Sequence, residues 1–343
     1  MPNCSNMPSI STHGVVADQW HYANNERIAQ LAESLGFDYL FPVSRWRGFG
    51  GDTNYLGTSL ETTTWAAALL RATQRIRIFS TVHVPLFHPM VIAKIGATLA
   101  HLSGDRWGLN VVSGWSQREF GMMGLTLDEH GRRYERSSAF IEILRALWDT
   151  RGEPVNHRSD WYAINDGVSL PRPARMPEIA NAGVSADAQA MTARLCDWSF
   201  MSGASIEALP GLVDTISAQA ETQGRRVKTA IFPFLLWRDS EAEALAELQR
   251  IIEQKDEVAT HNWLHDISAG SGSFDEFTGN MIAASGGGLP LLGDAEMVAE
   301  QLRAIHHSGV DAVMVTLQDY ERDLQRFGRE ILPILRRMGV TRY

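Results

Sequence analysis

The sequence predicts an α/β fold, a TIM-like (β/α)8 barrel formed by a single domain over residues 1–343. Short apolar runs alternate with amphipathic segments along most of the chain, which is typical of a parallel sheet buried on both faces. The length of 343 residues fits one barrel with insertions. The chain also lacks the G-x-G-x-x-G and G-x-x-x-x-G-K-[ST] turns that a doubly wound nucleotide-binding sheet would favour.

Seven strands are predicted, each followed by a helix. The first predicted helix has apolar residues at helical spacing and ends before Gly36. The first predicted strand, DYLFPV, is a short apolar run. The predicted strands are 38–43, 76–81, 107–112, 178–182, 198–201, 228–237 and 311–317. The predicted helices are 24–35, 60–72, 89–102, 134–148, 186–195, 206–221, 240–257, 295–307 and 319–338.

A complete barrel needs one more strand before the helix at 24–35. Residues 1–23 contain Pro2, Pro8 and Gly14 but no long apolar run, so the first strand is expected to be short or missing. The seam beside strand 38–43 should then be incomplete or covered by extended backbone. A doubly wound open sheet is the alternative fold.

Two insertions interrupt the alternation of strands and helices. Residues 150–177 carry four prolines and are expected to form an excursion before the next strand. Residues 261–293 contain SAGSGS and ASGGGLPLLG, a composition that suits a lid above the active site of a barrel enzyme.

The charge balance disfavours two classes of partner. With 31 Lys+Arg against 40 Asp+Glu, the net charge of −9 disfavours nucleic acid and anionic membranes. No apolar run approaches the ~20 residues that a membrane span needs. Two cysteines and an N-terminus without a signal-peptide pattern favour a reducing cytoplasm.

Polar residues follow the predicted strands at the end where barrel enzymes carry their active sites. Asn110 lies inside the apolar run WGLNVV, where a buried amide must find partners. It either satisfies neighbouring backbone or acts on a ligand. The other polar segments at this end are 44–51 (SRWRGFGG), 81–83, 110–115 and 181–185.

Ser185 is the predicted N-cap of the helix at 186–195. It is either a simple cap or part of a phosphate site, because free amides and the helix dipole converge at such an end. Arg132 and Arg133, beside Tyr134, could contribute a guanidinium to that phosphate. A solvated basic turn is the alternative.

Other patterns carry less chemistry. His261 and His265 lie four residues apart without a metal-binding motif, so no metal site is predicted. Cys4 has no motif around it, and Cys196 is expected in the core. Three tryptophans near predicted strand ends could line a planar ring ligand, although core packing explains most aromatic residues. These are Trp46, Trp107 and Trp115.

Several of these segments together resemble the bacterial luciferase-like flavin monooxygenases, in particular the pyrimidine, dimethyl sulfone and alkanesulfonate monooxygenase branches. The resemblance rests on RWRGFGG, NVVSGW, EFGMMG, RRYERSSAFIEILRALW and IANAGVSADAQAMTARL. It implies a TIM-like barrel enzyme. It implies that the cofactor is reduced FMN, supplied by a separate NAD(P)H:flavin reductase, and that O2 is the co-substrate. It also implies a homo-oligomer, a dimer or a tetramer.

The resemblance implies a small organic substrate, either a pyrimidine or amide-like ring compound. A sulfone or an alkanesulfonate is the alternative substrate. The alternative reaction is hydride transfer with a flavin or deazaflavin on the same barrel. The non-enzyme alternative is a flavin-storage protein without activity. Phe41 and Arg45 stand where the pyrimidine branch has leucine and lysine, so the substrate pocket should differ. Residues 1–5 match a PN-x-S segment that follows the first strand in that branch, so either the start site is misassigned or this strand is lacking.

Site residues are carried over from the pyrimidine branch position by position. The implied flavin contacts are Ser44, Arg45, Asn110, Glu119, Arg133, Tyr134, Val184 and Ser185. The implied oxygen side of the flavin comprises Thr81, Asn110 and Trp115, and His83 is a candidate for proton transfer.

Overall fold

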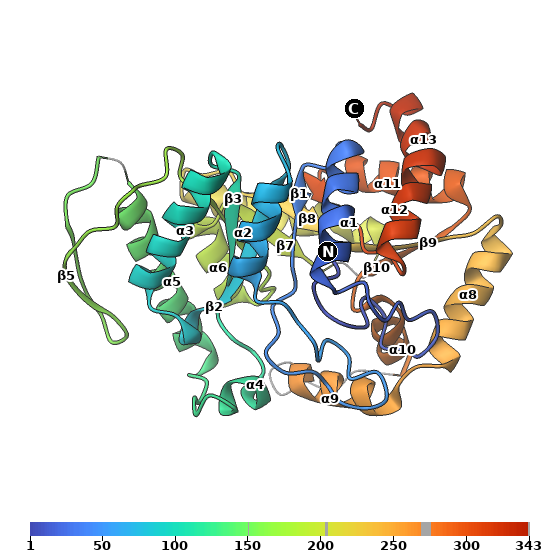
Figure 1. The fold of residues 1–343 in the computed structure, drawn as a ribbon, viewed down its shortest axis with the longest axis horizontal. Helices are drawn as coiled ribbons and strands as arrows, with labels where there is room; N and C mark the ends of the chain where they lie inside the picture. Colours follow the sequence, from blue (N-terminus) through green and yellow to red (C-terminus); the bar gives the residue numbers. More distant parts are fainter. Residues whose placement is uncertain (150, 203–204, 269–275, 342–343) are drawn as a thin grey trace.

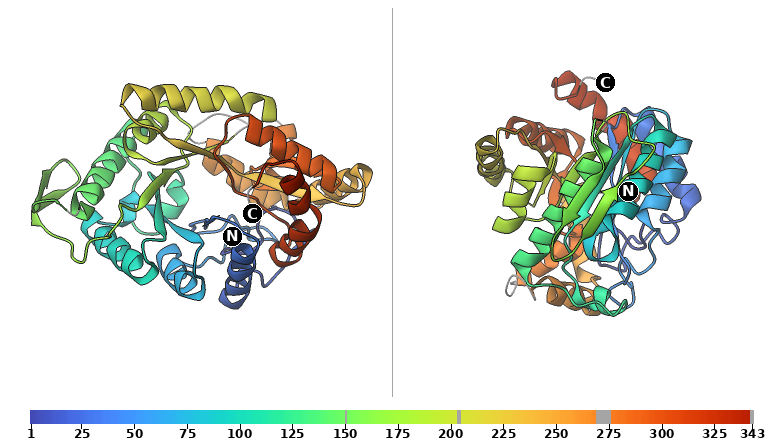
Figure 2. Two further views of the ribbon diagram at one scale, coloured as in Figure 1. Left: turned by 90° about the horizontal axis from the view of Figure 1, so that it is seen from above. Right: turned by 90° about the vertical axis from the view of Figure 1, so that its left-hand side faces the viewer.

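The structure, a computed structural model, describes residues 1–149, 151–202, 205–268 and 276–341. Within these ranges, seven parallel strands form one sheet whose spatial order follows the chain. The sheet curls and its helices cover the outside (Figure 2). This single direction of winding excludes a doubly wound sheet and confirms the TIM-like α/β fold. The strands are β1 (Tyr39–Leu40), β2 (Arg77–His83), β3 (Trp107–Val112), β6 (Glu178–Asn181), β7 (Trp198–Met201), β8 (Lys228–Ile231) and β11 (Ala312–Val313).

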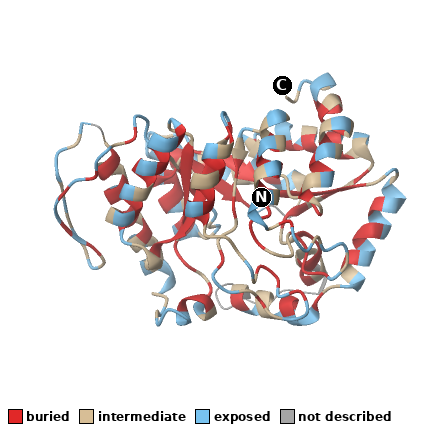
Figure 3. Ribbon diagram, viewed as in Figure 1, coloured by how far each residue is buried: buried red, intermediate tan, exposed pale blue. Residues whose placement is uncertain are grey.

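Amphipathic helices pack against the outer face of the sheet (Figure 1), and local capping sets their ends. The Glu61 carboxylate accepts hydrogen bonds from the Thr63 and Thr64 amides at the start of α2, and Gly104 ends α3 with φ 65°. Buried helix faces and strands together form the main core, red in Figure 3. The helices are α1 (Tyr22–Ser34), α2 (Thr62–Ala72), α3 (Pro89–Ser103), α5 (His130–Trp148), α6 (Ala186–Leu195), α7 (Leu209–Thr222), α8 (Glu241–Glu253) and α11 (Ala295–His307).

The strand predicted over 228–237 is divided at Phe232. β8 pairs with β7, whereas β9 (Pro233–Trp237) pairs with β10 (Leu289–Gly293). Pro233 has no amide hydrogen to donate to a neighbouring strand, so the chain changes its pairing partner there. The strand predicted over 311–317 is correspondingly short, and beyond β11 a single bridge joins Thr316 to Phe234.

The barrel is open along one seam. No strand lies between β1 and β11 in the described part of the chain, so the expected short or missing first strand is confirmed. The N-terminal segment instead covers the free side of β1. The Met1 amine donates to the Phe41 carbonyl at 3.0 Å, and the Asn3 side chain bonds both the amide and the carbonyl of Val43.

The two predicted insertions contain regular structure that the sequence reasoning missed. Residues 150–177 include an antiparallel hairpin of β4 (Val155–Arg158) and β5 (Ala163–Gly167). The second insertion overlaps α9 (Glu257–Ser268) and contains α10 (Glu276–Ser285) and β10, while 269–275 lie outside the described residues.

Two predicted helices are each divided. The helix predicted over 240–257 ends at Glu253, and the Asp256 carboxylate accepts from the Ala259 amide at the start of α9. The helix predicted over 319–338 becomes α12 (Tyr320–Glu330) and α13 (Leu332–Arg337), with Pro333 in the first turn of α13. A short helix, α4 (Gln117–Gly121), was also missed. None of the described helices has both the length and the apolarity to cross a bilayer.

Candidate active site

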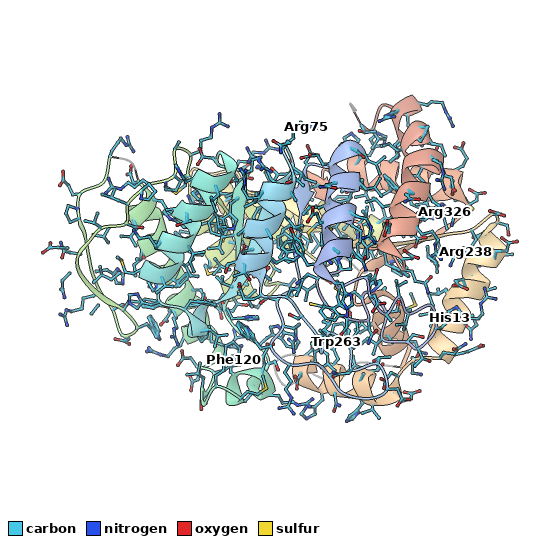
Figure 4. The ribbon with its side chains drawn as sticks, in the orientation of Figure 1. His13, Arg75, Phe120, Arg238, Trp263 and Arg326 are labelled. Atoms are coloured by element: carbon cyan, nitrogen blue, oxygen red, sulfur yellow. The ribbon has the colours of Figure 1, made fainter. Side chains whose placement is uncertain are left out.

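The candidate site lies where the parallel strands end, because the carboxyl ends of parallel strands meet at one edge of the sheet. Thr81 and His83 come from β2, Asn110 comes from β3, and α4 follows β3. α4 and α9 lie at the same end of the molecule in Figure 1, and Figure 4 places Phe120 and Trp263 there.

Asn110 and Thr81 form a buried polar pair. They are opposite each other in the β2–β3 ladder, and the Asn110 side-chain amide donates to Thr81 Oγ1 at 3.3 Å. Thr81 Oγ1 donates in turn to the Pro42 carbonyl. Asn110 Oδ1 is buried without any hydrogen-bond partner among the described residues. An unpaired buried carbonyl oxygen is costly, so this atom is placed to accept a hydrogen bond from a ligand.

Arg45 lies in the loop after β1, enclosed by two aromatic rings. Its Cζ atom is 4.7 Å from the ring centroid of Phe49 and 4.7 Å from that of Trp115. Its Nη1 is 3.4 Å from Glu119 Oε2, and the two side chains are 4% and 1% exposed. Nε and Nη1 of Arg45 have no hydrogen-bond partner within the described ranges.

Glu119 joins α4 to the loop after β1. The Trp46 amide donates to its Oε1, whereas its Oε2 has no hydrogen-bond partner in the described structure. Burial raises the pKa of the Glu119 carboxyl, and Arg45 opposes this rise. Ser116 caps α4 and donates to Asp266 Oδ2 on α9 at 2.7 Å, which fixes α4 from its other side.

His83 completes this buried cluster. Its ring packs edge-on against Phe120, and its Nε2 is 4.0 Å from Glu119 Oε2. Burial, together with the nearby Arg45 charge, lowers the pKa of His83 to about 3. The imidazole is therefore neutral near pH 7, so it can accept or donate a hydrogen bond but holds no extra proton to deliver.

The first turns of α5 and α6 meet to form a second part of the site. His130 Nδ1 is 3.0 Å from Asp187 Oδ2, which joins the two helix starts. Ser185 caps α6 as predicted, accepting from the Ala188 amide at 3.3 Å. Arg133 donates to the Gly114 carbonyl, and its Nε has no partner in the part of the chain described.

Gly183 and Tyr134 are packed closely at this corner. A Cβ atom on Gly183 would lie 2.8 Å from the Tyr134 hydroxyl, so only glycine fits without a shift. Val184 is 60% exposed, and Ser44 is half-buried in the loop before Arg45. The start of α6 offers free amides and the helix dipole, and Arg133 lies in the first turn of α5, so this corner suits an anion.

Two predicted residues, Arg132 and Trp107, lie away from this site, and Trp46 lies at its exposed edge. Arg132 pairs with Asp160 at 2.8 Å on the hairpin side, so it does not share the anion corner with Arg133. The predicted cluster of tryptophans is wrong for Trp107, which packs on Trp148 and donates to Ser80 on the outer face of the sheet. Trp46 is 40% exposed beside the site.

Cys196 lies in the core as predicted. Both cysteines are buried and free, and the histidines of α9 at positions 261 and 265 are exposed. Within the described ranges, no group of His, Cys, Asp or Glu has the arrangement of a metal site.

The fit of a flavin mononucleotide to this site can be judged from the buried polar atoms that have no hydrogen-bond partner. Five of the twelve side chains that carry such atoms in the described residues lie at the carboxyl end of the barrel, and an anion-binding corner lies at the starts of α5 and α6. A polar planar ring with a phosphate tail would supply partners for both regions, so the residues fit the group. The side chains are Arg45, His83, Asn110, Glu119 and Arg133.

Known proteins share the sequence of this chain over most of its length. Residues 7–312 match the luciferase-like monooxygenase family. The chain is 31% identical to the FMNH2-dependent dimethylsulfone monooxygenase of Pseudomonas putida, over 98% of this chain and 95% of that protein. It is 30% identical to the pyrimidine monooxygenase RutA of Acinetobacter baylyi, over 91% of this chain and 87% of that protein.

Among solved structures, the fold is similar to that of a riboflavin lyase, RcaE, described with modified FMN and riboflavin. The TM-score is 0.86 at 21% identity, covering 99% of this chain and 91% of the other. At this level of identity the likeness supports the fold alone.

Proposed function

Because this chain belongs to the luciferase-like monooxygenase family, we propose that it is a two-component monooxygenase that uses reduced FMN and O2 to oxygenate a small organic substrate. A separate NAD(P)H-dependent flavin reductase would supply the reduced FMN. The absence of a dinucleotide-binding turn from the sequence agrees with this division of labour. The two curated relatives above are monooxygenases, and one of them is described as FMNH2-dependent.

The set of buried, unpartnered polar atoms is the observation that carries this proposal. Folding leaves such atoms unpaired at a cost in free energy, and a ligand that pairs with them recovers it. Those of Arg45, His83, Asn110 and Glu119 lie around the mouth of the barrel, while Arg133 lies at the anion corner. Together they suit a ligand with a polar ring at one end and a phosphate at the other.

Each part of the site has a separate task in this proposal. Arg133 and the amides at the start of α6 would hold the phosphate, with Ser185 fixing the helix end. When bound, reduced FMN supplies the electrons with which O2 is activated. Thr81 and Asn110 are neutral groups positioned to bond oxygen at the ring.

The barrel interior beneath these groups is apolar and aromatic. Phe79 and Phe200 are buried there, and the Phe41 ring lies 5.4 Å from Phe79 and 4.4 Å from Phe200, measured between centroids. Such a floor excludes water from the reacting centre. It also favours a compact substrate with an apolar body.

The proposed substrate is a pyrimidine or amide-like ring compound, and a small sulfone is the second candidate. The two enzymes are almost equally similar to this chain, at 31% and 30% identity, so both substrate classes belong in the test. Phe41 and Arg45 stand where the pyrimidine branch is expected to have leucine and lysine, which indicates a changed pocket.

A reductase-coupled assay tests the proposal. The purified chain should bind reduced FMN more tightly than oxidised FMN and should not oxidise NADH by itself. With NADH, FMN, a flavin reductase and air, it should convert at least one member of a panel of pyrimidines, cyclic amides and sulfones. Substrate-dependent reduction of a deazaflavin without O2 would point to hydride transfer instead. Flavin binding with no oxygenated product from any panel member would contradict the proposal.

A further inference from the structure

The pairing between β3 and β6 ends beside the anion corner. The last paired positions are Asn110 of β3 and Ala180 of β6, and soon afterwards the chain leaves the sheet to enter α6. Ala180 belongs to the cluster inside the barrel, together with Phe79 and Phe200. Because successive side chains of a strand point to opposite faces, Asn181 points outward, toward the helices. It therefore does not face the flavin ring of the proposed function.

The Asn181 side chain continues the contact between the two strands where their backbones separate. Its Nδ2 donates to the Val111 carbonyl at 2.8 Å, one residue beyond the last pair. Its Oδ1 accepts from the Gly183 amide at 2.8 Å and from Thr192 Oγ1 on α6 at 3.3 Å. An asparagine amide carries both donors and an acceptor, so this one side chain joins β3, the turn into α6 and α6 itself.

The turn after Asn181 has little freedom. The bond from the Gly183 amide to Asn181 Oδ1 spans two residues, as in an Asx turn. A Cβ atom on Gly183 would lie 2.6 Å from the Ala188 Cβ and 2.8 Å from the Tyr134 hydroxyl, so the turn packs directly against α6 and α5. Ser185 caps α6 two residues later. Asn181 and this packing together set where the free amides of α6 lie.

Arg133, the other part of the anion corner, is attached to the same extension of β3. Its guanidinium donates to the Gly114 carbonyl. Its own carbonyl is 2.9 Å from Ser137 Oγ, which is 2.7 Å from Ser113 Oγ. Both parts of the anion corner are therefore held to the segment 111–114.

Burial makes the contacts of Asn181 hard to replace. The residue is only 3% exposed. An alanine at this position would leave the Val111 carbonyl and the Gly183 amide without their partner, and an unpaired buried group is costly, so the turn should shift. A shift of the turn would change its position relative to Asn110, which lies next to Val111 and is proposed to contact the ring.

We infer that Asn181 is a positioning residue: it holds the phosphate turn, residues 183–185, at a fixed position relative to the end of β3, so that one flavin can contact both. This inference rests on the proposed function and adds a residue that acts on the flavin only through its neighbours. The alternative is an amide that stabilises the fold without any effect on the ligand. The two roles differ in how much the phosphate contributes to flavin affinity.

Comparison of FMN with riboflavin isolates that contribution, because riboflavin has the same ring and ribityl chain but no phosphate. Quenching of tryptophan fluorescence by each reduced flavin, without O2, gives the two affinities. The wild type should bind FMN at least about tenfold more tightly than riboflavin. Asn181→Ala should lower this ratio by about fivefold or more, mainly by weakening FMN. A folded variant with the wild-type ratio, or a wild-type ratio near one, would overturn the inference.

Asn25→Ala is the matched control. Asn25 is also buried, and its amide also donates to backbone carbonyls, but these belong to Pro2 and Gln19 in the N-terminal segment. Its loss should lower the melting temperature and leave the ratio of the two affinities unchanged. A fall in the ratio as large as that of Asn181→Ala would overturn the inference, because any buried amide would then have this effect.

Thr192→Val covers the case in which Asn181→Ala does not fold. Valine has a similar shape but cannot donate to Asn181 Oδ1, so the ratio should fall about twofold. Thr229→Val removes a hydroxyl that is equally buried in β8, where it contacts Asp311, and should leave the ratio unchanged. Equal ratios for the two threonine variants would overturn the inference. Failure of the wild type to bind reduced FMN would refute the proposed function, and the inference with it.

Discussion

The two ends of the barrel each hold a carboxylate beside cations, yet they are built differently. At the amino ends of the strands, Glu178 accepts from Lys228 at 2.5 Å, from Arg77 at 2.9 Å and from the Tyr39 hydroxyl at 3.2 Å. At the carboxyl ends, Glu119 has one oxygen without a hydrogen-bond partner in the described structure.

The pKa shifts of the two carboxyls differ in the same way. Burial would raise the pKa of Glu178, but Lys228 and Arg77 bring it below its usual value. Burial raises the pKa of Glu119, and Arg45 only partly offsets the rise. A carboxylate whose oxygens all accept hydrogen bonds from protein groups stabilises the fold, whereas a carboxylate with an unpartnered oxygen is available to a ligand. The comparison predicts that mutations at one end change stability and that mutations at the other change binding and turnover.

The largest effect is expected for Asn110→Ala and Thr81→Ala. Losing one neutral hydrogen-bonding group that acts on oxygen at the ring should raise the barrier by about 2.7–4 kcal/mol, a 100- to 1,000-fold fall in turnover. Binding of reduced FMN should change little, and hydrogen peroxide should be released instead of product. Product, peroxide and flavin affinity are measured together. A stable Asn110→Ala enzyme with unchanged coupling would contradict this role.

Arg133→Ala should weaken flavin binding by about 1.5–3 kcal/mol, since it removes a charge-assisted contact to the phosphate. Ser185→Ala should cost less, because it removes a neutral cap. Arg132→Ala is the matched control, because Arg132 neighbours Arg133 but pairs with Asp160. Titration with FMN measures all three, and equal affinities for Arg133→Ala and the control would remove the phosphate from this corner.

His83→Gln should alter the pH dependence of stability. In the unfolded chain the imidazole gains a proton below its ordinary pKa of 6.5, whereas in the folded chain it does so only near 3. The folded state therefore loses stability as pH falls from 6.5 towards 3, by up to about 1.4 kcal/mol per pH unit. The variant should lack this slope, as judged by denaturant unfolding at pH 7 and pH 4.5. The exposed His101→Gln should retain it, and equal slopes for both variants would show that His83 titrates normally.

Glu178→Gln should give the smallest effect, a loss of about 1 kcal/mol of unfolding free energy, because its cationic partners are more than a third exposed. Flavin affinity should remain that of the wild type. Denaturant unfolding and FMN titration measure the two quantities. Weaker flavin binding without a loss of stability would contradict the separation between the two ends.

Much of the fold was predictable because burial imposes simple patterns. The alternation of apolar strands and amphipathic helices identified the sheet, and the composition of residues 1–23 identified the missing strand. The break at Phe232 could also have been inferred, since Pro233 cannot donate a ladder hydrogen bond. α4 has a capping-box signal, Ser116 followed by Glu119 three residues later, which was overlooked.

The site was less accessible to sequence reasoning. Trp107 was grouped with residues of the mouth, although it is three positions from Asn110 and must face the opposite side of the strand. Asp266 was not predicted at all, because its contact with Ser116 joins residues 150 positions apart. Local pattern contains no information on such a pairing, and only tertiary packing creates it. The charge balance between Arg45 and Glu119 likewise depends on a distance that the sequence does not encode.

The open seam also affects the order in which the barrel loses its structure. In the described residues, β1 and β11 each have a neighbouring strand on one side only, whereas β2 and β3 are paired through six consecutive positions. Amide hydrogens at the seam should therefore exchange with deuterated solvent through small local openings. Those of β2 and β3 should exchange only when a larger part of the sheet unfolds. On heating, the barrel should unfold from this edge inward, and the strands that carry Thr81 and Asn110 should be among the last to unfold.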